Sequence, residues 1–144
     1  MALYCYGGGW VIGSHQAYDS SARALIDTAG TAMVLTGYRL ATNNKFAAAH
    51  DDTFTTFQWV RTNARQFNGD PFRVAVVGES AGGNMAASIA IRARAQWVPL
   101  PLVQVLTYPV TNHAFTTPFR QVNQNTSWSS TKSLRHSNGF MSTS

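Results

Sequence analysis

"VVGESAGGN", residues 76–84, is the stretch that decides the fold. An apolar run, "FRVAVV" at residues 72–77, leads into the serine motif and an alanine-rich run follows it, so the pattern predicts a buried strand, a tight turn and a helix over about residues 81–95. Gly78 and Gly82 permit the tight turn, and Ser80 between them is expected to expose its hydroxyl. This strand, turn and helix are the context of a nucleophile elbow, although a short G-x-S-x-G motif alone also occurs as a simple packing turn.

A second glycine stretch lies upstream, in "YGGGW" at residues 6–10. A nucleophilic serine needs a base and also needs donors for the oxyanion that forms during attack on a carbonyl. Consecutive glycines expose backbone N–H groups, although alone they are equally consistent with a flexible turn. Together with the elbow, they predict an oxyanion hole built from the N–H groups of Gly8, Gly9 and Ala81. Glu79 completes the elbow motif before the serine.

Strand and helix patterns alternate around these two motifs. Strands are predicted over residues 2–6, 31–40, 72–77 and 102–107, and helices over residues 18–30, 47–68 and 81–95, with Gly30 as a C-cap. Continuously apolar strands separated by helices predict a parallel sheet of about four strands with helices on both faces. The fold class is therefore α/β, as a partial doubly wound core.

The chain resembles the hormone-sensitive-lipase-like carboxylesterases of the α/β-hydrolase fold. The resemblance rests on "YGGGWVIGS", "GYRLATNNKFAAAHDDTFTTFQWV", "VVGESAGGNMAA" and "VLTYPVT". It implies that Ser80 is the nucleophile, that Gly8, Gly9 and Ala81 form the oxyanion hole, and that small-molecule esters are hydrolysed without a metal or cofactor. It also implies a partial α/β-hydrolase core over residues 1–118.

The sequence departs from the family pattern at several positions. Tyr6 replaces the family histidine before the glycines, Thr42 and Ala47 replace prolines, and Asn112 replaces an acid. The acid and histidine that complete the family triad have no counterpart, so the chain is expected to be crippled as a catalyst. An alternative is a non-catalytic binding module or a gene remnant.

Four histidines could replace the missing base. His15, His50 and His136 are interpreted as solvated or capping residues. His113 is the remaining weak candidate, because it follows the strand expected beside the Ser80 strand, at the sheet edge where α/β sites form. Asp51 and Asp52 are expected to cap or face solvent, and Tyr38 and Arg39 to be structural.

Composition excludes several other classes of function. The net charge of +5 arises because no Asp or Glu follows Ser80, not from a basic cluster, so no nucleic-acid partner is predicted. No apolar run is long enough to span a bilayer, and no leader is recognised, which makes a cytoplasmic location the default. The single Cys5 forms no internal disulfide and is interpreted as a buried strand residue.

Residues 119–144 are rich in Ser, Thr and Asn and lack periodicity. They are interpreted either as a disordered tail or as the product of a reading frame that slipped between about Arg120 and Trp128. A sheet of only four strands has two open edges, so self-association through those edges is also expected.

Overall fold

The computed structural model describes residues 1–112 of the 144-residue chain. Its elements are β1 (Ala2–Cys5), α1 (Asp19–Ala29), β2 (Met33–Leu35), α2 (Ala48–Asn63), the 3-10 helix η1 (Ala64–Phe67), β3 (Ala75–Glu79), α3 (Ala81–Ala95) and β4 (Gln104–Thr107). The predicted tail, His113 and His136 lie outside the described residues. Within the described part, no helix has the length and apolar character needed to cross a membrane.

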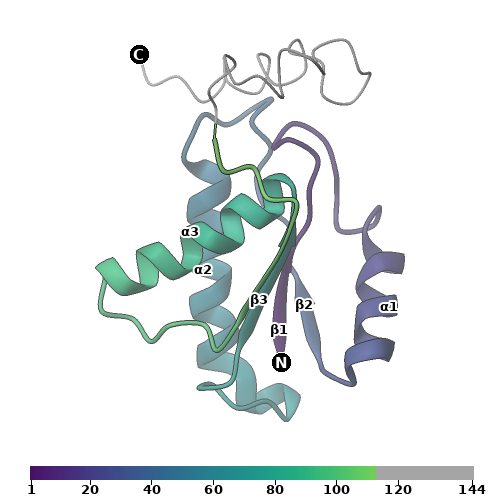
Figure 1. Cartoon of the computed structure of the whole chain (residues 1–144), viewed down its shortest axis with the longest axis vertical. Coiled ribbons are helices and arrows are strands. Elements are labelled where there is room, and N and C mark those ends of the chain that lie inside the picture. Colours follow the sequence, from purple (N-terminus) through teal and green to yellow (C-terminus); the bar gives the residue numbers. More distant parts are fainter. Residues whose placement is uncertain (113–144) are drawn as a thin grey trace.

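The four strands form one parallel sheet in the order β2-β1-β3-β4. Helix α1 lies on one face, whereas α2 and α3 pack together on the other (Figure 1). The predicted α/β class, strand number and two-sided helix arrangement are therefore confirmed. All four strands run the same way, so their carboxyl ends, and the loops that follow β1 and β3, meet at one edge of the sheet.

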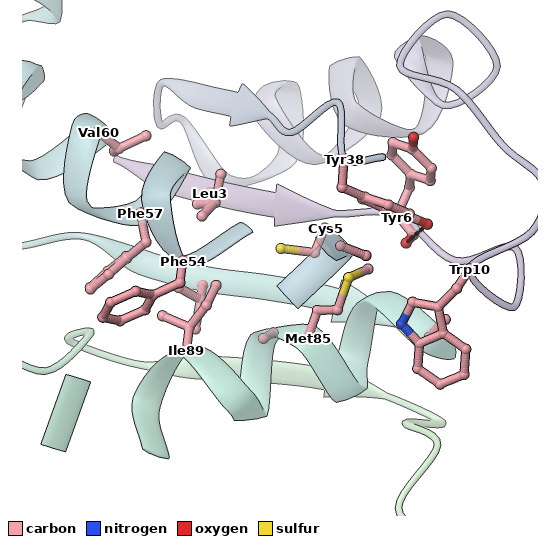
Figure 2. Packing of buried hydrophobic residues seen from close by; sticks show 14 of the residues in the cluster. Leu3, Cys5, Tyr6, Trp10, Tyr38, Phe54, Phe57, Val60, Met85 and Ile89 are labelled. Atoms are coloured by element: carbon pink, nitrogen blue, oxygen red, sulfur yellow. Dashed lines mark hydrogen bonds between the residues drawn. The ribbon is translucent and has the colours of Figure 1, made fainter. Parts of the chain in front are cut away.

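The core lies mainly between the sheet and the pair of helices α2 and α3. Phe54 and Phe57 of α2 pack with Ile89 of α3 and with Leu3 of β1 in one buried cluster (Figure 2). Leu3 and Phe57 are fully buried, so they anchor the helices to the central strand. This packing fixes the start of α3, and hence the turn before it, against β1.

Two predicted elements differ from the observed ones. The strand predicted over residues 31–40 ends at Leu35, because the next residues leave the sheet and Tyr38 and Arg39 bond to other segments. The helix predicted over residues 47–68 is α-helical only to Asn63 and then tightens into a 3-10 turn that Asn68 ends in the left-handed conformation.

The expected cover of helices on both faces of the sheet does not extend to β4, which lies at an edge of the described sheet. All four of its residues are exposed, whereas β1 is buried throughout. Among the described elements β4 is the last strand of the sheet, and α3 is the helix that packs on it. An apolar strand sequence is therefore not sufficient for burial; the position of the strand in the sheet decides it.

Candidate active site

Ser80 lies in the turn between β3 and α3 with φ 51° and ψ −119°. A non-glycine residue with positive φ costs about 1–3 kcal/mol, and such residues persist only where surrounding contacts hold them. Here the Ser80 N–H donates to the Thr107 carbonyl at 3.0 Å, and the Ser80 carbonyl accepts from the N–H groups of Asn84 and Val110, both at 3.1 Å. The strained serine is thus held by β4 and the turn after it.

The glycines of the elbow are required by close approach of backbones. A Cβ on Gly82 would overlap the Cys5 carbonyl group, and one on Gly78 would overlap the Gly82 carbonyl group. A Cβ on Gly83 would lie 2.9 Å from the Cβ of Pro109. The first turn of α3 therefore packs directly on β1 and on the segment after β4.

The glycine loop after β1 lies beside the serine. A Cβ on Gly7 would lie 3.4 Å from the Ser80 Cβ, so the two segments are in contact. Gly8 and Gly9 have φ values of 100° and 60°, in the region that glycine enters without strain. The predicted nucleophile and the predicted oxyanion loop are thus adjacent in space.

Three backbone N–H groups remain available near this contact. Across residues 1–112, the N–H groups of Gly8, Gly9 and Ala81 donate no backbone or side-chain hydrogen bond. Ala81 is the first residue of α3, where N–H groups have no intrahelical acceptor and the helix dipole favours negative charge. These are the properties that an anion-binding pocket requires.

Two tyrosines hold the glycine loop. The Tyr38 hydroxyl, buried in the core, donates to the carbonyls of Gly7 at 2.7 Å and Tyr6 at 3.1 Å. Burial, and then the neighbouring Tyr6, raises the pKa of Tyr38 above its ordinary range, so it stays a donor. The Tyr4 hydroxyl donates to Glu79 at 2.7 Å, and the other carboxylate oxygen of Glu79 accepts a long bond from the Gly7 N–H.

Tyr6, directly before the glycines, packs against two other tyrosines. Its ring stacks on Tyr38 and Tyr18, with centroids 4.4 Å and 5.0 Å away. The sequence predicted a structural role for Tyr38, and its bonds to the loop agree with that prediction. Arg39 is also structural, since its Nε and Nη2 both donate to the Asp52 carboxylate and this ion pair links the segment after β2 to α2.

The two described histidines have different surroundings. His15 is exposed, as predicted. The prediction that His50 is solvated or capping is wrong: it is 7% exposed, and its Nε2 lies 2.9 Å from Asn84 Oδ1. Its ring also stacks against Trp10, with centroids 6.2 Å apart. Within residues 1–112, neither histidine is hydrogen-bonded to Ser80.

Asn84 is the site residue that sequence reasoning missed. It follows Ser80 by four residues, one turn of helix α3, and that spacing places both residues on one helix face. Its side chain joins His50 to the Val110 carbonyl, the latter at 2.7 Å. The i, i+4 relation to the serine was the available signal.

Other reactive groups and hollows lie apart from Ser80. Burial raises the pKa of the Cys5 thiol to about 12, so the thiol is protonated and unreactive at neutral pH. Among the described residues, no three His, Cys, Asp or Glu side chains lie close enough together to hold a metal ion. A hollow of about 490 Å³ is lined by His50 and Asn84 among others, and one of about 810 Å³ lies at the end of α3, beside Trp97; Ser80 lines neither.

Residues 2–141 match the model of a family described as having the alpha/beta hydrolase fold. The match covers most of the chain, and the sheet order, elbow and glycine loop described above agree with it. The chain belongs to the α/β-hydrolase-fold family.

Several relatives are esterases, in agreement with the resemblance to hormone-sensitive-lipase-like carboxylesterases. The chain is 40% identical over 111 residues to carboxylesterase NlhH of Mycobacterium tuberculosis and 39% identical over 111 residues to ethyl acetate hydrolase of Pseudomonas putida. These matches cover 77% and 76% of the chain and 35% of each relative, so the chain spans about a third of their length.

Solved structures give the same result. An ester hydrolase from the metagenome of Lake Arreo superposes with a TM-score of 0.92 at 31% identity, over 99% of this chain and 45% of that one. Carboxyl esterase 2 of Tuber melanosporum superposes with a TM-score of 0.91 at 26% identity, over 98% of this chain and 47% of that one.

Proposed function

We propose that the chain carries the nucleophile and the oxyanion-binding groups of a carboxylic-ester hydrolase that acts on small-molecule esters. The observation that supports this most is the contact between a strained serine, Ser80, and a glycine loop whose N–H groups are unbonded within residues 1–112. The esterase relatives support the same reaction class.

In the proposed reaction, the Ser80 Oγ attacks the ester carbonyl carbon and releases its proton. The carbonyl oxygen becomes an oxyanion that accepts hydrogen bonds from the N–H groups of Gly8, Gly9 and Ala81. Collapse of this intermediate breaks the ester C–O bond, and the alcohol leaves with a proton. Water then hydrolyses the acyl-serine and restores the hydroxyl.

We further propose that this chain turns esters over slowly. No histidine or carboxylate bonds Ser80 within the described residues, so the serine proton passes to water instead of to a positioned base. Enzymes that lose the triad but keep the oxyanion hole retain roughly 10³- to 10⁴-fold catalysis over water. When the ester is in large excess over the chain, only a small fraction of it is bound at any time, so the observed hydrolysis of p-nitrophenyl butyrate should barely exceed the background rate.

Labelling with a fluorophosphonate tests the nucleophile directly. Mass spectrometry should locate the slow adduct on Ser80, and the Ser80→Ala variant should take up none. Ser88→Ala is the matched control, because Ser88 lies two turns further along the same helix and should leave labelling unchanged. Absence of any Ser80 adduct would overturn the proposal in favour of a non-catalytic module, and rapid ester turnover lost in Ser80→Ala would show that a base is present.

A further inference from the structure

The Ser80–Ala81 peptide is clamped from outside the elbow. Because a peptide group is planar, the Ser80 carbonyl and the Ala81 N–H are rigidly linked and point in opposite directions. The Val110 N–H donates to that carbonyl at 3.1 Å. Whatever fixes Val110 therefore also fixes the direction of the Ala81 N–H, which is the proposed oxyanion donor.

Asn84 holds Val110 from its other side. The Asn84 Nδ2 donates to the Val110 carbonyl at 2.7 Å, so both backbone groups of Val110 are bonded to the first turn of α3 or the residue before it. Pro109, just before it, packs against Gly83, where even a Cβ would be too close. The segment after β4 is thus held on the elbow by two hydrogen bonds and a close contact. We call these contacts of Asn84, Pro109 and Val110 the clamp.

His50 is hydrogen-bonded to the other end of the Asn84 amide. A carbonyl can only accept a hydrogen bond, so the NH₂ group of Asn84 must face Val110 and its Oδ1 must face His50. His50 Nε2, at 2.9 Å from that oxygen, must then carry a proton and donate. The His50 backbone is itself held, since Arg92 Nη1 donates to the His50 carbonyl at 2.9 Å.

The opposite side of His50 contacts the glycine loop. Its ring lies against Trp10, with an interplanar angle of 25°, and Trp10 follows Gly9 directly. The Trp10 carbonyl accepts from the Ala41 N–H at 2.8 Å, which anchors that end of the loop. His50 therefore contacts both segments that supply the proposed oxyanion donors, α3 through Asn84 and the glycine loop through Trp10.

We propose that Asn84 and His50 are positioning residues that set the Ala81 N–H against the glycine loop, without contacting substrate. This inference rests on the proposed function of Ser80. A displacement of about 1 Å can lower the rate of a positioned reaction by about 10²-fold, so loss of the clamp should slow the reaction of Ser80 by about ten- to a hundredfold.

Paired variants test the proposal. The His50 ring contacts both Trp10 and Phe46, the latter edge-on with centroids 5.1 Å apart. His50→Phe keeps a ring in this place but removes the donor, whereas His50→Gln places an amide N–H near the position of Nε2. Asn84→Asp keeps an acceptor for His50 but loses the donor to Val110. We expect Ser80 labelling by a fluorophosphonate, corrected for folded fraction, to fall about ten- to a hundredfold in His50→Phe and Asn84→Asp and to recover in His50→Gln.

Hydrogen–deuterium exchange provides a readout that does not depend on reactivity. Exchange over residues 105–112 should accelerate in His50→Phe and Asn84→Asp while exchange in β1 stays unchanged. If His50→Gln reacts as slowly as His50→Phe, or if labelling and exchange match the parent chain in all variants, the positioning role is overturned. Absence of labelling in the parent chain overturns instead the proposed function of Ser80, while exchange still decides whether the clamp exists.

Discussion

Strands β1 and β4 are both apolar in sequence, yet they have opposite surroundings. Leu3 of β1 is fully buried, whereas Val105 of β4 is 47% exposed and Tyr108, just after β4, is 71% exposed. β1 lies between two strands and under two helices, while β4 ends the described sheet. The proposed site uses both: its nucleophile and oxyanion loop follow central strands, and its clamp comes from the segment after the exposed strand.

The largest expected effect comes from the contact between α3 and the central strand. Gly82→Ala would drive a Cβ into the Cys5 carbonyl, and backbone cannot move aside there without separating α3 from β1. We expect a loss of at least about 4 kcal/mol in the free energy of unfolding, or failure to fold. Urea unfolding measures the change.

Gly30→Ala is the matched control for that substitution. Gly30 caps α1 with φ 59°, but a Cβ there meets no atom within 4 Å, so only backbone strain opposes it. The cost should be about 1 kcal/mol. Equal losses in the two variants would contradict the steric explanation for Gly82.

A smaller effect is expected when one side chain is shortened in each of the two strands. Leu3→Ala removes a fully buried side chain and should lower the free energy of unfolding by about 3 kcal/mol, through lost burial and a residual cavity. Val105→Ala should change it by no more than about 0.5 kcal/mol, since that side chain is half exposed. A comparable loss at Val105 in thermal or urea unfolding would mean that β4 is covered in solution.

The smallest effect involves the exposed ion pair between Arg39 and Asp52. The Arg39 hydrogen bonds hold the pKa of Asp52 below its ordinary value of 3.8, so the folded state binds a proton less readily than the unfolded state. The stabilisation is therefore complete above about pH 5 and is lost as pH falls through and below 4. Because the pair is partly exposed, Asp52→Asn should cost only about 0.5 kcal/mol at pH 7.

Unfolding of the parent chain and Asp52→Asn across pH 2–7 checks this expectation. The difference between the two proteins should shrink toward acid. A difference that stays constant over that range would show that the carboxylate charge contributes nothing there.

Local signals predicted the parts of the fold that depend on neighbours in sequence. Helix α3 spans the predicted residues, and the Gly30 N–H bonds the Ile26 carbonyl in the predicted left-handed cap. The predicted elbow and glycine loop are adjacent for a different reason: the alternation of strands and helices indicated a parallel sheet, and pairing of β1 with β3 brings the loops after them to one edge. Motifs and the order of elements were sufficient for these features.

Features decided by distant partners were not predictable in this way. His50 is buried because Asn84, 34 residues away, and Trp10 in the glycine loop surround it, and neither contact leaves a periodic pattern around His50. Strand β4 reads as a core strand because its composition is apolar, whereas its exposure depends on its place in the sheet order. Long-range pairing sets both outcomes.

The register of the two central strands also has a consequence for the order of assembly. Ala2 pairs with Ala75 and Cys5 with Gly78, so a loop of more than seventy residues must close before the first strand gains its central neighbour. Pairings between such distant residues form slowly, because chain entropy is lost before the contacts compensate. During synthesis, the glycine loop emerges from the ribosome long before Ser80 does. The two halves of the proposed site therefore meet late, and no partly synthesised chain that lacks β3 can hold the oxyanion loop against a nucleophile.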